Sequence, residues 1–171
     1  HNFIQYGKPY YGSEEDKQVK KVLNSNWIGT GPISQKFEKN FSEYKKVNYA
    51  KSLNSCTAAL HLSLLLLNLK KNDEVITTPL TFAATINSII LAGGKPVLVD
   101  IRNDTYNIDE KKIEKKITRK TKAILLVHFG GIPCDMDPII KIANKYNLKI
   151  IEDCAHAIES KYKNKNTGSF G

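Results

Sequence analysis

The sequence has few cysteines and no long apolar run, and each shortage excludes a class of protein. Its longest apolar stretch, Leu62–Leu67, contains Ser63 and falls far short of the about 20 residues that a membrane-spanning helix needs. Residues 1–7 contain no basic segment followed by an apolar core, so we expect no secretory signal either. The three cysteines are odd in number and lack a pairing spacing, which argues against a disulfide framework and favours a reducing, cytoplasmic setting.

Arginine is also scarce. Only Arg102 and Arg119 among the 26 basic residues are arginine, so lysine produces the net charge of +9. The lysines are scattered, and the aromatic residues do not interleave with basic clusters as they do in nucleic-acid sites. The densest basic run, Lys111–Lys122, is typical of the exposed face of a helix. We therefore expect no nucleic-acid partner.

The rest of the composition predicts a single folded domain of the α/β class. The length of 171 residues and the apolar fraction of 41% suit one globular domain. Strands buried on both faces are indicated by β-branched runs at 74–77, 96–100, 123–128 and 148–152. Helical stretches lie near 82–91, 109–117 and 136–146. This alternation predicts a three-layer α/β/α fold with a mostly parallel sheet.

Three more helices are expected before the first strand. The acidic residues after Ser13 predict a helix start, because negative charge is favourable at the positive end of the helix dipole. Ser34 opens a second predicted helix. The third follows the turn Asn54–Thr57 and runs to about Leu69. It is apolar nearly all round, so we expect it to be buried.

Polar residues follow the predicted strands and are the candidate functional residues. Ligands of open parallel sheets bind outside the carboxyl ends of the strands, which here carry Thr77, Thr78, Pro79, Asp100, His128, Glu152, Asp153 and His156. Neither a glycine-rich nucleotide fingerprint nor a phosphate-loop lysine motif is present. The spacing of His128, Asp153 and His156 is not that of a recognised metal site, so we expect no metal.

Each candidate has a functional and a structural interpretation. The turn Asn54–Thr57 offers N–H groups and hydroxyls to a phosphate, or simply caps a helix. Asp153 pairs with a cationic heterocycle nitrogen, or caps the residues that follow it. Phe82 stacks on a flat cofactor or packs in the core. His156 donates a hydrogen bond into the same crevice or is structural.

Eight stretches together carry a specific resemblance. In order they are Trp27–Pro32, Asn54–His61, Asp73–Phe82, Gly94–Asp100, Lys120–Ile124, Val127–Gly131, Glu152–Ala157 and Gly168–Gly171. They resemble the DegT/DnrJ/EryC1/StrS family of sugar aminotransferases, which use pyridoxal phosphate (PLP), over nearly the whole chain. The resemblance implies that residues 1–171 are the N-terminal part of a fold-type-I large domain, like that of aspartate aminotransferase. The family's C-terminal small domain is absent from this sequence.

The resemblance also implies roles for particular residues. The phosphate of PLP would be held by three consecutive residues, Ser55, Cys56 and Thr57. The family usually has Gly or Ala at the second of these positions, a departure that a backbone contact tolerates. Phe82 would stack on the pyridine ring, Asp153 would pair with its protonated nitrogen, and His156 would hydrogen-bond its phenolic oxygen.

The implied reaction moves an amino group, with glutamate as donor, to the keto group of a nucleotide-linked deoxysugar. Such sugars supply surface polysaccharides, glycans or antibiotics. Trp27 and Thr30 lie in a segment that resembles the family's substrate-side loop. Family members are homodimers, so the resemblance implies a homodimer for the intact protein.

One departure from the family concerns its Schiff-base lysine. In the family this lysine follows a Ser-Phe stretch downstream of the segment matched by Gly168–Gly171, so none of the lysines here stands at its position. We therefore expect the 171-residue chain alone to be inactive as a transaminase. Two alternatives remain open. One is the dehydratase branch of the family, in which histidine replaces the lysine, and the other is a non-catalytic remnant with exposed apolar surface.

Overall fold

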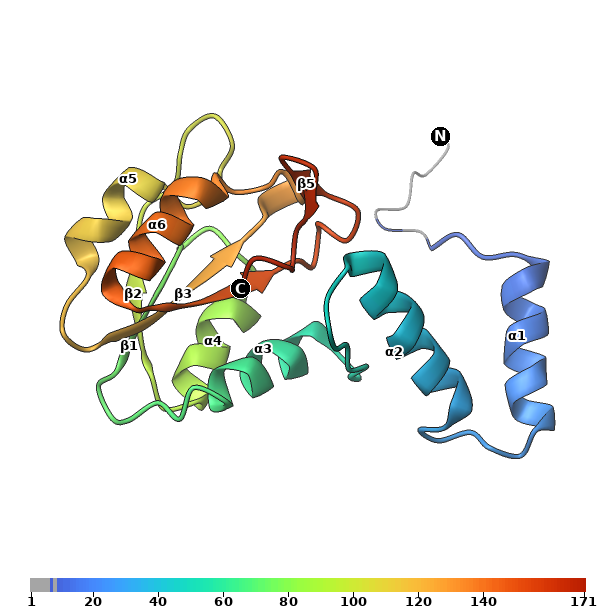
Figure 1. Ribbon diagram of the computed structural model, residues 1–171. Coiled ribbons are helices and arrows are strands. Elements are labelled where there is room, and N and C mark those ends of the chain that lie inside the picture. The colour runs from blue at the N-terminus through green and yellow to red at the C-terminus, as the bar shows by residue number, and fades with distance from the viewer. Residues whose placement is uncertain (1–6, 8) are drawn as a thin grey trace, which may run out of the picture. The chain divides into compact units, whose positions relative to one another are not determined.

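The computed structural model describes Gly7 and residues 9–171 (Figure 1). The expectation about residues 1–7 therefore lies outside the described residues, except at Gly7. The chain divides into two compact units. The first runs up to Tyr44 and includes Asn48–Ser52, and the second comprises Lys45–Val47 and Leu53–Gly171. The assignment of residues 1–171 to one large domain stays a prediction.

Two helices make up most of the first unit. Helix α1 spans Ser13–Asn24, as the acidic residues predict, and the N–H of Gly12 donates to the Glu15 carboxylate at 2.6 Å. Helix α2 spans Pro32–Lys45 and begins two residues before the predicted start at Ser34. The earlier start has a physical reason, since the fixed φ and missing N–H of proline suit the first turn of a helix.

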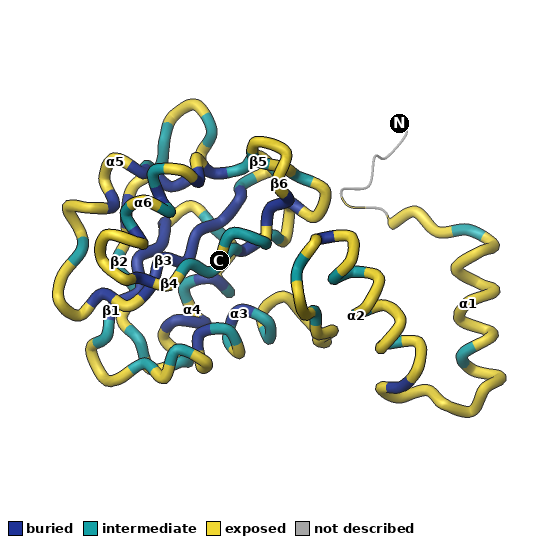
Figure 2. The backbone as a smooth tube through the Cα atoms, in the orientation of Figure 1, coloured by how far each residue is buried: buried dark blue, intermediate teal, exposed yellow. Residues whose placement is uncertain are grey.

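The second unit contains the parallel sheet that the sequence predicts. Its strands are β1 (Glu74–Thr77), β2 (Lys95–Leu98), β3 (Thr121–Val127) and β4 (Lys149–Asp153). Their order is β2-β1-β3-β4, and every neighbouring pair is parallel. The central strands β1 and β3 are buried, as Figure 2 shows. The expectation of burial on both faces is wrong for β2 and β4, because these strands form the edges and are only partly covered.

Helices cover both faces of this sheet, which makes the predicted three layers (Figure 1). On one face lie α3 (Cys56–Leu65) and α4 (Ala83–Leu91). On the other lie α5 (Glu110–Ile113), continued by a 3-10 turn at Glu114–Lys116, and α6 (Met136–Tyr146). Successive strand residues point to opposite faces, so each face has its own apolar cluster. One cluster includes Leu60, Leu64, Val75, Ile89 and Leu125, and the other includes Ile76, Ile113, Ile124, Leu126, Met136 and Ile139.

Helix α3 differs from its prediction. It ends at Leu65 rather than near Leu69, and only Leu60 and Leu64 of its residues are buried. Leu66, just after the helix, is 83% exposed. The reason is geometric, since a helix lying on one face of a sheet covers a single stripe of its own surface. An apolar sequence all round the helix therefore did not imply burial all round.

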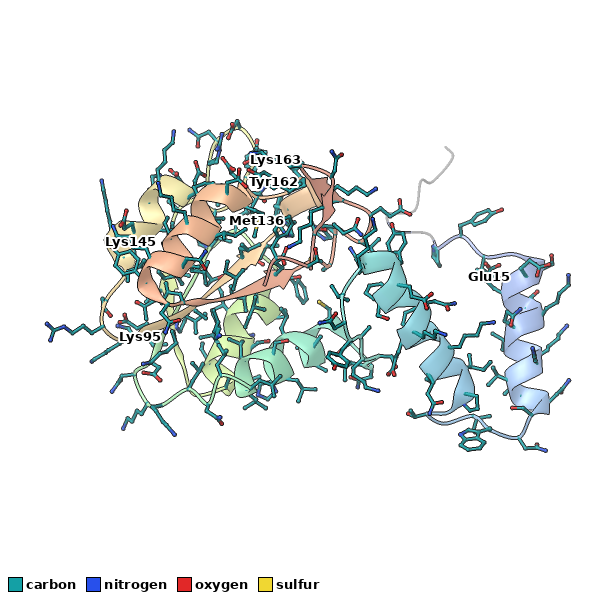
Figure 3. The ribbon with its side chains drawn as sticks, viewed as in Figure 1. Glu15, Lys95, Met136, Lys145, Tyr162 and Lys163 are labelled. Carbon is teal, nitrogen blue, oxygen red and sulfur yellow. The ribbon has the colours of Figure 1, made fainter. Side chains whose placement is uncertain are left out.

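A short antiparallel hairpin was not predicted. It pairs β5 (Lys161–Tyr162) with β6 (Lys165–Asn166). The two turn residues between them, Lys163 and Asn164, have φ of 45° and 66°. Asn-Gly is the usual sequence signal of a two-residue hairpin turn, and Lys163-Asn164 lacks it, so the local sequence did not predict this hairpin. The Tyr162 hydroxyl donates to Asp135 and Lys163 pairs with Asp137, which ties the hairpin to the start of α6 near Met136 (Figure 3).

Three expectations from composition can be compared with the structure. No helix among residues 7 and 9–171 is long and apolar enough to cross a membrane. All three cysteines are free, as predicted. The basic run Lys111–Lys122 is more than one helix face, because it extends from α5 through the 3-10 turn to the start of β3. Within it, Lys111 and Lys112 are exposed and Ile113 is buried.

Candidate functional site

The carboxyl edge of the sheet gathers two side chains and one backbone N–H around one carboxylate. Asp153 is the last residue of β4 and is only 5% exposed. The Thr85 hydroxyl on α4 donates to its Oδ2 at 2.9 Å. The Ala155 N–H donates to Oδ1 at 3.2 Å, and Cys56 Sγ at the start of α3 lies 3.8 Å from the same oxygen. Helices α3 and α4 and the turn that follows β4 therefore meet at Asp153.

The donors around Asp153 are all electrically neutral. Among the residues that the structure describes, no lysine, arginine or histidine forms a salt bridge with it. A buried carboxylate is costly unless it is hydrogen-bonded and paired with a positive charge. Burial, followed by the nearby charge of Asp153, raises the pKa of the Cys56 thiol, so that the thiol remains a neutral donor. The site therefore has the chemistry to accept a cationic group.

The turn that precedes α3 is a helix cap. Ser55 has extended backbone angles and its hydroxyl accepts the N–H of Ala58 at 3.1 Å. The structural interpretation of Ser55 is thereby confirmed. It does not compete with the functional one, because the N–H groups of a first helical turn have no acceptor within the helix and face outward. The N–H groups of Cys56 and Thr57 belong to this turn, and a phosphate is the kind of ligand that such a turn accepts.

Phe82 immediately precedes α4 and is 78% exposed, so core packing does not explain it. Its neighbour Thr81 is half-buried, and the Thr81 and Thr85 hydroxyls are 2.7 Å apart. Thr85 itself escaped the sequence analysis. A single threonine inside an apolar helix gives no signal, and only the position of α4 on the face of the sheet brings Thr85 to Asp153.

His156 lies in the loop after β4 and is exposed. Its Nδ1 accepts the N–H of Gly130 at 3.3 Å, so the neutral ring carries its proton on Nε2. Gly131 has φ of +83°, and a Cβ there would lie 2.9 Å from the His156 carbonyl oxygen. The missing side chain of Gly131 lets this turn lie close to the His156 backbone, and the N–H of Gly130 then orients the His156 ring.

Two other strand-end residues, His128 and Glu152, do not join this group. His128 Nδ1 accepts the N–H of Cys134 at 3.0 Å, and its Nε2 lies 3.0 Å from Glu152 Oε2. The Glu152 carboxylate also accepts N–H groups from the segment Gly168–Gly171. Adjacent strand residues point to opposite faces, which separates Glu152 from Asp153. The role of Glu152 is to hold the last described segment against β4.

The candidate metal ligands of the sequence analysis do not come together. The described residues contain one group with suitable distances, formed by His128, Glu152 and Cys154 with ligand atoms within 4.8 Å of one another. Hydrogen bonds already use both nitrogens of His128 and both oxygens of Glu152. Burial raises the pKa of the Cys154 thiol to about 12, so the thiol is neutral among these groups. This group is a hydrogen-bonded support.

Trp27 and Thr30 lie in the first unit. The indole N–H of Trp27 donates to the Thr30 carbonyl at 3.1 Å, and the ring packs on Gly31, where a Cβ would lie 2.5 Å from it. The turn borders a cavity of about 330 Å³ that also involves residues of α1 and the start of α2. The local geometry thus gives this loop a defined, partly apolar hollow.

Comparison with known proteins identifies the class of protein. The model of the DegT/DnrJ/EryC1/StrS aminotransferase family matches residues 9–171, and the chain belongs to this family. The spore coat polysaccharide biosynthesis protein SpsC of Bacillus subtilis is 45% identical over 99% of this chain and 44% of its own length. GDP-perosamine synthase of Escherichia coli O157:H7 is 45% identical over 99% of this chain and 47% of its own length.

A solved structure agrees in fold. Spr1654 of Streptococcus pneumoniae, described in a PLP form, superimposes with a TM-score of 0.93 at 35% identity. The match covers 98% of this chain and 47% of that one. The chain thus spans about half the length of the relatives that it matches. The fold-type expectation from sequence is confirmed.

Proposed function

We propose that this chain supplies the PLP-binding part of an aminotransferase that acts on a nucleotide-linked keto-deoxysugar. The observation that carries the proposal is the buried Asp153 carboxylate, whose partners among the described residues are neutral donors. A protonated pyridine nitrogen would provide the missing positive charge. The family and the two named relatives, SpsC and GDP-perosamine synthase, support the substrate class.

The residues at the carboxyl edge of the sheet fit the chemical parts of PLP. The phosphate requires hydrogen-bond donors, which the first turn of α3 offers through three consecutive residues, Ser55, Cys56 and Thr57. The aromatic ring requires a flat apolar contact, which the exposed Phe82 offers. The phenolic oxygen requires a donor, and Nε2–H of His156 is the free ring donor in the neutral tautomer.

When bound, PLP supplies an electron sink that stabilises negative charge as the α-proton of the amino substrate leaves. The residues of this chain set the charge and the orientation of the cofactor ring. Asp153 favours the protonated form of the ring nitrogen, because a buried anion next to a cation stabilises the charged form. His156 stabilises negative charge on the phenolic oxygen. The turn that starts α3 fixes the phosphate and hence the orientation of the ring.

The remaining parts of the proposal concern the intact protein. Its amino donor is glutamate, and the loop with Trp27 and Thr30 contributes to binding of the sugar substrate. It is a cytoplasmic homodimer, for which the three free cysteines support the reducing compartment. The Schiff-base lysine is supplied outside residues 1–171, so the 171-residue chain alone has no transaminase turnover.

The test compares the full-length protein with its Asp153→Asn variant. We expect the wild type to retain PLP after dialysis, seen as a visible absorption band, and to form 2-oxoglutarate from L-glutamate with a GDP-linked keto-deoxysugar. Asp153→Asn removes the negative charge at nearly constant shape and should weaken PLP binding at least about tenfold. Asp100→Asn is the matched control, since Asp100 follows β2 at the same edge but is an exposed side chain paired with Lys112.

Absence of bound PLP from the wild type would overturn the proposal. Equal PLP retention by wild type and Asp153→Asn would contradict the proposed role of Asp153 in binding the cofactor. The reading frame beyond Gly171 distinguishes the branches of the family. Lysine after the Ser-Phe stretch gives the aminotransferase, histidine gives the dehydratase, and a stop codon leaves a remnant without enzymatic activity.

A further inference from the structure

The carboxylate of Asp153 is the end of a chain of hydroxyl groups. Thr85 Oγ1 lies 2.9 Å from Asp153 Oδ2, and Thr81 Oγ1 lies 2.7 Å from Thr85 Oγ1. Thr85 lies in the first turn of α4 and is fully buried, and Thr81 lies two residues before the helix and is half-buried. The chain of groups therefore runs from the half-buried Thr81 into the interior and ends on the carboxylate.

The direction of these hydrogen bonds follows from the chemistry of the groups. An ionised carboxylate only accepts, so the single proton of the Thr85 hydroxyl is donated to Asp153. Thr85 then has only lone pairs left for Thr81, and the Thr81 hydroxyl must be the donor of the second bond. A hydroxyl that accepts one hydrogen bond becomes a stronger donor in the next, so Thr81 strengthens the bond from Thr85 to Asp153.

The local structure of Thr85 indicates that this bond is specific. A threonine within a helix can return its hydroxyl to the carbonyl oxygen one turn earlier. Ser88 on the same helix does this, since its Oγ donates to the Ala84 carbonyl at 2.6 Å. Thr85 instead directs its hydroxyl across 68 positions of sequence to β4. It bonds one carboxylate oxygen and leaves the carboxylate only weak or more distant donors on the other, at 3.2 and 3.8 Å.

We propose that Thr85 is a positioning residue for the cofactor, acting through Asp153, with Thr81 as its support. This inference rests on the proposed function, in which Asp153 pairs with the ring nitrogen of PLP. Thr85 fixes the plane of the carboxylate and stabilises its ionised form in a buried place that has no resident cation among the described residues. The carboxylate is thus oriented before the cation arrives, and binding does not have to order it.

Four variants of the full-length protein test the inference. Thr85→Val keeps the shape of the side chain and removes the hydroxyl, and we expect the Kd for PLP to rise about tenfold or more, as for loss of a hydrogen bond to a charged group. Thr85→Ser keeps the hydroxyl and should stay within about threefold of the wild type. Thr81→Val should have an intermediate effect. Ser88→Ala removes a buried hydroxyl from the same helix without touching Asp153 and should leave the Kd unchanged.

A second readout separates positioning from general loss of packing. With PLP labelled with ¹⁵N in its ring, the nitrogen chemical shift of the bound cofactor reports the protonation of that atom. We expect the ring nitrogen in Thr85→Val to lose its proton at lower pH than in the wild type, and Ser88→Ala to match the wild type. Thermal unfolding of the same variants without PLP shows whether each one folds.

Unchanged PLP affinity and an unchanged nitrogen titration in Thr85→Val would overturn the inference. So would an equal effect of Ser88→Ala, because the loss would then follow from any missing hydroxyl in α4. Should Thr85→Val fail to fold, Thr81→Val and Thr85→Ser still decide the matter, since rescue by serine and weakening by Thr81→Val are both required. Failure of the wild type itself to bind PLP would instead overturn the proposed function.

Discussion

The substitution Glu152→Gln should release the segment Gly168–Gly171 from the sheet. The Glu152 side chain is 3% exposed, and its Oε1 accepts the N–H groups of Phe170 at 2.7 Å and Gly171 at 3.0 Å. Its Oε2 accepts the N–H of Gly168 at 2.8 Å and lies 3.0 Å from His128 Nε2. A glutamine has one oxygen and one NH₂ group in place of the two carboxylate oxygens. One of the two pairs of donors, Phe170 with Gly171 or Gly168 with His128, must therefore face the NH₂ group, which is itself a donor.

The magnitude follows from counting these bonds. Whichever way the amide is turned, two hydrogen bonds to a charged acceptor are lost, each about 1.5–3 kcal/mol, for a total of about 3–6 kcal/mol. A change of tautomer at His128 gives no relief, because its Nδ1 already accepts the N–H of Cys134. Detachment of the segment limits the loss to the free energy that holds residues 168–171 in place.

The same contacts give a direction with pH. Burial raises the pKa of Glu152, but the hydrogen bonds from His128 and from the N–H groups of Gly168, Phe170 and Gly171 outweigh it, and the net pKa is lowered. A carboxyl whose folded pKa is below the unfolded one stabilises the fold fully above the unfolded value, about 4.3. That stabilisation disappears as the pH falls through the lower folded value. The difference between wild type and Glu152→Gln should therefore be full at neutral pH and shrink in acid.

The assay combines urea unfolding of the full-length protein with hydrogen exchange at the amides of residues 168, 170 and 171. Glu159→Gln is the control, because Glu159 is an exposed glutamate only seven positions along the chain and should change stability by no more than about 0.5 kcal/mol. We expect Glu152→Gln to lose amide protection at all three positions. A loss of stability below about 1 kcal/mol with protection retained would refute the bond count.

Two further predictions concern chemical reactivity and titration. Cys56 is exposed, whereas burial raises the pKa of Cys134 and Cys154 to about 12, so iodoacetamide should label Cys56 first. Peptide mass spectrometry at pH 8 checks this, and equal rates at the three thiols in the native state would contradict it. Hydrogen bonds from Lys51 and neighbouring donors lower the pKa of Glu38 to about 2. A carboxyl ¹³C NMR titration should find that midpoint, and Lys51→Met should move it upward; an unshifted midpoint in the variant would show that Lys51 is not its cause.

The elements with a strong local pattern were predicted well, and the predictions that failed concern features that depend on neighbouring elements. Helix α6, Met136–Tyr146, has the predicted bounds because its amphipathic period is regular and Asn147 ends it in the left-handed conformation. The strands were found from β-branched runs, but their place in the sheet was not. The sequence of the edge strand β2 has the same β-branched pattern as that of a central strand. Its burial depends on which strands and helices lie beside it, and the local pattern does not specify them.

The candidate site was predicted as a set of strand-end residues and not as a geometry. Parallel strands place their carboxyl ends along one edge, which is why Asp153 and His156 could be selected from sequence. Because adjacent strand residues point to opposite faces of the sheet, Glu152 contacts His128, whereas Asp153 contacts Cys56 and Thr85.

The sequence by itself determined the parallel α/β sheet, the free cysteines, the family and the edge of the sheet at which to look for function. Those features are encoded in periodicity, in residue type and in the order of short motifs, all of which are local. Only the tertiary structure decided that Thr85 is hydrogen-bonded to Asp153 and that Glu152 holds residues 168–171. These pairs join residues distant in sequence, and their existence depends on how α4 lies on the sheet and on how the last segment lies against β4. No local pattern carries that information.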